Sequence, residues 1–174
     1  LISQGLPLLH DAYGNVLLSA AVAYPRRQGS GPWIYPEQAA LHCVVSQAEY
    51  INSVNPSASP LDFWQILGVN WQTRSYEIGG LAAPDNAPFT TDALREKVLE
   101  ALQQPISAQE ARPETPWSRL LSWAYDLYWN ANQTAALPQG EITAQALGYG
   151  GMAAVITDEE LLDIFGDRVD ATFM

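Results

Sequence analysis

The residues of this chain that could carry out chemistry are few. The single cysteine, Cys43, directly follows His42, and a thiol close to an imidazole is a common pair in nucleophilic catalysis. Adjacent residues on one strand point to opposite faces of a sheet, however, so a strand here would stop the pair from sharing a proton. The other histidine, His10, is distant in sequence and completes no metal-ligand spacing. We therefore interpret these residues as structural, and a thiol-dependent hydrolase remains an alternative.

Two further stretches have compositions found in ligand sites. Asp158, Glu159 and Glu160 could bind a cation, but they lack the Asp-x-Asp-x-Asp-Gly frame of a calcium loop, and acids at the start of a helix explain them better. Residues 148–151 (GYGG) are rich in glycine but lack the GxxxxGK[ST] pattern of a phosphate-binding loop. We expect no catalytic, cofactor-binding or metal-binding residue, and a metal-dependent hydrolase is the corresponding alternative.

The net charge of the chain limits the kinds of molecule that we expect it to bind. The 174 residues include 8 Lys and Arg against 19 Asp and Glu, a net charge of −11, and most of the excess lies after residue 74. No basic stripe is present for a nucleic-acid backbone, and an anionic membrane surface would repel the chain. We interpret the acidity as an aid to solubility. A stand-alone acidic binding protein or inhibitor is the alternative.

The apolar content indicates contacts with other protein. Only 16% of the residues are charged, whereas 6 are tryptophan and 8 are tyrosine. One cysteine excludes an internal disulfide, and no apolar run approaches the roughly 18 residues of a membrane span, so we expect no direct membrane insertion. The start, LISQGLPLLH, lacks the basic region of a signal peptide and an initiator methionine, which suggests a fragment or a processed product.

The first half of the chain predicts strands. Two apolar runs surround the stretch Asp11-Ala12-Tyr13-Gly14-Asn15, and the Gly14-Asn15 pair can supply the positive φ that a tight turn needs, so we predict a β-hairpin over 5–24. Further strands are expected over 40–51 and 66–78. The second of these alternates with mixed faces, which is typical of a strand that is partly covered on both sides.

The second half of the chain predicts helices. Apolar residues repeat at helical spacing over 91–103, where Thr91 or Asp92 can cap, and over 116–130, where Pro116 suits a first turn. A third helix is expected over 158–165. Strands followed by helices indicate an α+β fold, with a strand-rich portion 1–81 and a mostly helical portion 82–174.

The turn stretch has a counterpart in a known family. Asp11-Ala12-Tyr13-Gly14-Asn15 resembles the D-x-x-G-N half of the tyrosine–aspartate (YD) repeats of RHS proteins. It continues as NVLLSAAVAYPRR at 15–27 and is followed by VNWQTRSYEI at 69–78, LYWN at 127–130 and AVITDEEL at 154–161. This ordered set resembles the middle region of the B component of bacterial insecticidal toxin complexes, the SpvB-like TcaC or TcdB type.

The resemblance implies a structural role. Such B components build a β-shell with a C component, enclose a cytotoxic polypeptide and dock through a propeller on a pore-forming A component. By resemblance, residues 1–174 are a single segment of that shell, secreted with the complex, and partners are the remaining B segments and the C and A components. The chain lacks the propeller, the self-cleavage site and a toxic domain, so no catalytic residue carries over. The only site residues are those of the structural turn, Asp11, Tyr13, Gly14 and Asn15.

Overall fold

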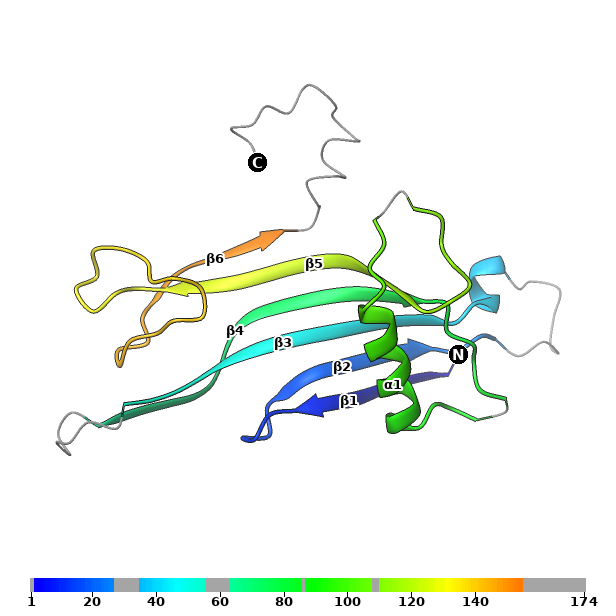
Figure 1. Ribbon diagram of the computed structural model, residues 1–174, viewed down its shortest axis with the longest axis horizontal. Helices are drawn as coiled ribbons and strands as arrows, with labels where there is room; N and C mark the ends of the chain where they lie inside the picture. The colour runs from blue at the N-terminus through cyan, green and yellow to red at the C-terminus, as the bar shows by residue number, and fades with distance from the viewer. Residues whose placement is uncertain (1, 27–34, 56–62, 86, 108–109, 155–174) are drawn as a thin grey trace, which may run out of the picture.

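One curved antiparallel sheet makes up most of the molecule. The computed structural model describes residues 2–26, 35–55, 63–85, 87–107 and 110–154. The strands are β1 (Ser3–His10), β2 (Val16–Ala23), β3 (His42–Asn55), β4 (Trp64–Gly79), β5 (Trp117–Tyr128) and β6 (Gly148–Ala154), and the helices are the short 3₁₀ helix η1 (Pro36–Ala39) and α1 (Thr91–Leu102). The strands lie in the sheet in their sequence order, each antiparallel to the next (Figure 1).

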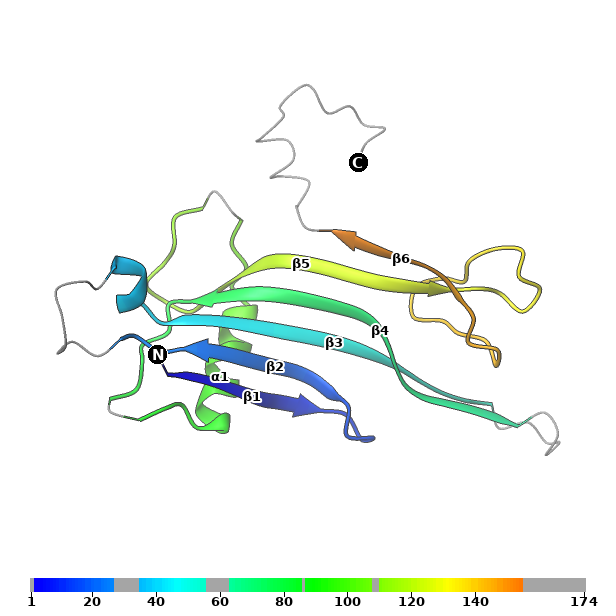
Figure 2. The same cartoon turned by 180° about the vertical axis from the view of Figure 1, so that it is seen from behind.

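The helix α1 covers one face of the sheet, and the core lies between the two. In Figures 1 and 2 the helix lies on the same side of strands β1 to β4, in front of the sheet in one view and behind it in the other. The buried apolar side chains come from alternate positions of the strands, from one side of the helix and from the residue before its N-cap: Leu8, Leu18, Ala20, Val22, Cys43, Val45, Ile78, Phe89, Leu94, Val98 and Ala101. The opposite face of the sheet has no helix over it in the described part of the chain.

Local sequence explains where α1 starts and how it is fixed to the sheet. The N-cap is Thr90, whose hydroxyl accepts a hydrogen bond from the backbone N–H of Ala93 at 3.3 Å, and not Thr91 or Asp92 as expected. Just before the cap, the Phe89 N–H donates to the Tyr24 hydroxyl at 2.7 Å, and Gln4 Nε2 donates to the Phe89 carbonyl at 3.0 Å. These contacts attach the helix entry to β1 and to the end of β2.

The α+β fold class predicted from the sequence is wrong. The described chain is an antiparallel sheet with α1 as its only α-helix, and the segment 116–130 predicted as a helix is the strand β5. The register of β5 contains a β-bulge, because Tyr76 pairs with Leu120 while Ser75 pairs with Ser122, leaving Leu121 as an extra residue. The apolar residues that repeat at helical spacing lie on both faces of this strand, since Trp117 pairs with Gly79 and Leu120 with Tyr76, so their spacing does not mark one apolar face of a helix.

The other predicted elements lie close to observed ones. The hairpin over 5–24 is present as β1 and β2, the strand over 66–78 lies within β4, and the strand over 40–51 overlaps β3. The helix over 91–103 is present as α1. The helix over 158–165 lies outside the described residues. Within 82–174, expected to be mostly helical, the described residues form α1, β5 and β6.

The β3–β4 hairpin extends beyond its neighbours. Strand β2 pairs with β3 only as far as Gln47, and β5 pairs with β4 only as far as Gln72. Past these points residues 50–55 and 64–70 continue as a two-stranded extension that projects from the sheet (Figure 1), which we call the distal arm. The arm and its end expose the large apolar side chains of Val54, Phe63 and Leu67.

Candidate functional site

The turn between β1 and β2 is organised by one carboxylate. Asp11 Oδ1 accepts hydrogen bonds from the backbone N–H groups of Tyr13 at 2.8 Å and Asn15 at 2.9 Å, while Oδ2 accepts from Asn15 Nδ2 at 2.8 Å. Gly14 has a φ of +87°, and Asn15 does not have a positive φ. The exposed Tyr13 takes part through its backbone, so the D-x-x-G-N residues have separate roles in the turn.

The same carboxylate links the turn to the distal arm. Asp11 Oδ2 also accepts from Asn52 Nδ2 of β3 at 3.0 Å, and Asn52 Oδ1 accepts from the Gly68 N–H of β4 at 2.9 Å. Partial desolvation raises the pKa of Asp11, but the hydrogen bonds from Asn15, Tyr13 and Asn52 outweigh it, and the net pKa is below its ordinary value. Two hairpins are thus joined through one ionised group.

The adjacent pair His42 and Cys43 does not form a catalytic dyad. His42 is exposed and Cys43 is 1% exposed, on opposite faces of β3, as their positions on one strand predict. Burial raises the pKa of the Cys43 thiol to about 11, so the nucleophilic thiolate is scarce at neutral pH. The thiol acts as a small apolar group in the core.

A chain of polar side chains crosses three strands. Gln72 of β4 is 3% exposed; its Nε2 donates to Glu49 Oε1 of β3 at 2.6 Å, and its Oε1 accepts from Trp123 Nε1 of β5 at 2.7 Å. The guanidinium of Arg74 lies 5.0 Å from the Trp123 ring centroid. Because the buried amide is satisfied on both sides, these contacts hold the three strands in register.

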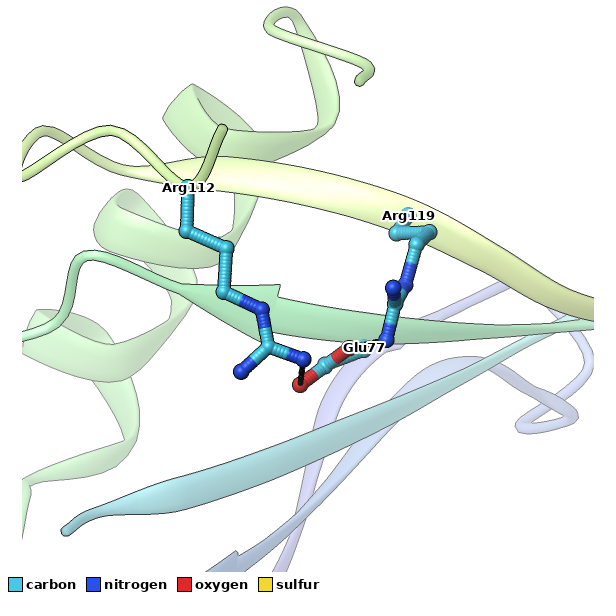
Figure 3. A network of polar contacts seen from close by, with 3 residues as sticks. All are labelled: Glu77, Arg112 and Arg119. Carbon is cyan, nitrogen blue, oxygen red and sulfur yellow. Dashed lines mark hydrogen bonds and ion pairs between the residues drawn. The ribbon is translucent and has the colours of Figure 1, made fainter. Parts of the chain in front are cut away.

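A second polar group lies on the face opposite α1. Arg112 and Arg119 both point toward Glu77 (Figure 3); Arg119 forms a close ion pair with it, and Arg112 NH2 lies 3.6 Å from its Oε1. The Arg112 guanidinium also lies 5.7 Å from the ring centroid of Trp117, and that ring rests on Gly79, where a Cβ would come within 2.1 Å of it. The connection between α1 and β5 is thereby fixed to the sheet.

The two edges of the sheet differ. The edge strand β1 contains Pro7. Proline has no N–H to donate to a neighbouring strand, so within sheets it is found mainly on edge strands. The opposite edge strand β6 has the sequence GYGGMAA, without charge or proline, and every residue in it is exposed. The glycine-rich stretch 148–151 therefore lies in an exposed edge strand of the described sheet.

Clustered metal-ligating groups are not found in the part of the chain that the structure describes. No group of three or more His, Cys, Asp or Glu side chains there is arranged to hold a metal ion. The acidic residues 158–160 lie outside the described residues. Among the described helices, none has the length and apolar character needed to cross a membrane.

Of the comparisons with known proteins, the one with solved structures gives a match. No family model matches the chain, and neither does any curated protein. The fold is similar to part of a chain in the structure of a mutant Photorhabdus luminescens Tc holotoxin pore, with a TM-score of 0.56 and 20% sequence identity. The similarity covers 95% of this chain and 8% of that chain, so this chain spans a small fraction of the neighbour's length. The described sheet therefore has the fold of a segment from a toxin-complex structure.

Proposed function

We propose that the chain is a wall segment of a toxin-complex B component, where it contributes to the β-shell that encloses and delivers a cytotoxic polypeptide. The fold similarity over 95% of the chain to a segment of a Tc holotoxin chain supports this most strongly. The resemblance of residues 11–15 to an RHS repeat, and of residues 69–78 to the toxin-complex B component, supports it from the sequence. In this proposal the whole chain is one segment, secreted with the complex.

The open parts of the sheet support a role in a larger wall. Strand β6 has exposed residues throughout and no charge or proline, so its free backbone groups suit pairing with a further strand. The distal arm has only two strands, and a two-stranded hairpin in water is at best marginally stable. Adjoining wall strands beside β6 and around Val54, Phe63 and Leu67 would cover both features.

The environments of the described side chains support a structural role for the chain rather than a catalytic one. Cys43 is buried with a raised pKa, and the polar groups around Gln72 and Glu77 are occupied by contacts between strands. The partners in the proposal are the remaining B segments, the C component and the pore-forming A component.

Size-exclusion chromatography with light scattering tests the proposal. We expect the isolated chain to self-associate through the β6 edge, and co-expression with the adjoining segments of its own polypeptide to replace this by a defined complex. Ala154→Lys places a charge at the exposed end of β6 and should reduce self-association.

Gly5→Lys is the matched control. It adds the same charge to the opposite edge, at a position with no atom within 4 Å of an added Cβ, and should leave self-association unchanged. A stable 19.1 kDa monomer that ignores the adjoining segments would contradict the proposal and favour an independent binding module.

A further inference from the structure

A trough crosses the sheet face opposite α1, over β4, β5 and β6. Thr73 lies five residues before the core residue Ile78 in β4, so the alternation of the strand places it on the uncovered face, where it pairs with Ala124. Two adjoining cavities of about 290 Å³ and 350 Å³ lie there and share Asp126 and Gly151. Their linings include four aromatic residues, Trp71, Tyr125, Tyr128 and Tyr149.

Asp126 stands in the trough without a cation beside it. Within the described part of the chain, the ion pairs join Asp92 to Arg95 and Glu77 to Arg112 and Arg119, and none includes Asp126. Its position depends on a glycine, because a Cβ at Gly151 of β6 would lie 2.8 Å from Asp126 Oδ1. The carboxylate therefore lies directly over the β6 backbone.

The negative charge of Asp126 acts on the aromatic residues beside it. Burial raises the pKa of Tyr128, and the negative charge of Asp126 raises it further. Aromatic rings close to an unpaired carboxylate offer a cation both a charge partner and π-faces, and a planar guanidinium can use the two together. A glycine floor lets a partner backbone approach closely.

We propose that the trough binds an arginine side chain on an extended segment of a partner polypeptide, with its guanidinium paired to Asp126 beside the rings of Trp71 and Tyr128. Charge complementarity selects this occupant, since Asp126 is the one charged residue in the lining of either cavity and its charge is negative. Cavities of about 300 Å³ or more are typical of small binding sites, and the two together exceed that.

A peptide titration of the whole chain tests the proposal. The probe is N-acetyl-Gly-Arg-Gly-amide, followed by isothermal calorimetry, with the citrulline peptide as an uncharged match in shape. We expect saturable binding of the arginine peptide that is weaker by about fivefold or more for the citrulline peptide. Equal binding of the two, no saturable binding, or a lysine peptide that binds as tightly would overturn the proposal.

Matched variants locate the site. Asp126→Asn should weaken binding of the arginine peptide by about fivefold to tenfold, whereas Asp85→Asn, on an exposed loop, should leave it unchanged. Gly151→Ala keeps the charge but displaces the carboxylate, so it should also weaken binding, and Gly5→Ala should not. Full affinity in Asp126→Asn or in Gly151→Ala would overturn the proposal.

The test separates this site from the proposed role in a wall. The effect of Ala154→Lys on self-association tests the role of the β6 edge. The effect of Asp126→Asn on peptide affinity tests the arginine site, so one proposal can fail while the other holds.

Discussion

At the scale of residues, this chain uses polar chemistry to hold strands together. The Asp11 carboxylate accepts four hydrogen bonds from three residues, and Gln72 joins β3 to β5 through one amide. The role of Asp11 within its own turn could be inferred from the D-x-x-G-N pattern. Its bond to Asn52 could not, because the two lie 41 positions apart and no local pattern indicates that distance.

The turn carboxylate predicts a pH dependence. The pKa of Asp11 is lowered in the folded chain from its ordinary value of 3.8, so its stabilisation is present above that pH and is lost as the pH falls through the lower folded value. Asp11→Asn should therefore lower the melting temperature at neutral pH, and the deficit should shrink below pH 3.8. Thermal melts over this pH range, with Asp85→Asn for comparison, measure the difference in melting temperature. A difference that does not change with pH would show that the charge of the Asp11 carboxylate does not stabilise the turn.

At the scale of elements, the sequence predicted what local periodicity determines. The apolar side of α1 is regular, with Leu94, Val98 and Ala101 buried at helical spacing, and it was predicted nearly to its bounds. Strand β5 was not predicted, since the register that defines the bulge at Leu121 is set by pairing with β4. The trough around Asp126 was missed for a similar reason, because residues of three strands form it.

The β1–β2 turn allows a clean test of backbone strain. An added Cβ meets no atom within 4 Å at Gly14 or at Gly5, but only Gly14 has a positive φ, of +87°. Gly14→Ala should lower the free energy of unfolding by about 1 kcal/mol, the cost of the left-handed region for a residue with a Cβ. Gly5→Ala should not lower it. Urea denaturation measures both, and equal stabilities would show that the turn does not depend on glycine.

At the scale of the whole molecule, the sheet is supported unevenly. The helix α1 and the core occupy one end, where β1 to β4 lie beneath it, while the distal arm and β6 extend away from this support (Figure 1). Stability against local opening follows buried apolar contacts, so the two ends should differ.

Hydrogen exchange can measure this difference. We expect backbone amides of 50–55 and 64–70 to exchange faster than those of 43–47 and 74–78, where β3 and β4 have partners on both sides. Co-expression with adjoining segments should slow exchange in the distal arm selectively. Uniform protection of the isolated chain would mean that the arm is stable without further strands.

The strict sequence order of the strands has a consequence for how such a protein can change during evolution. Each strand pairs only with those before and after it, so every connection joins two strands that are neighbours in the sheet. A hairpin gained or lost by duplication or deletion at the β6 end would lengthen or shorten the sheet without rerouting any remaining loop. The architecture can therefore vary in size by whole hairpins, while the helix-covered end keeps its core unchanged.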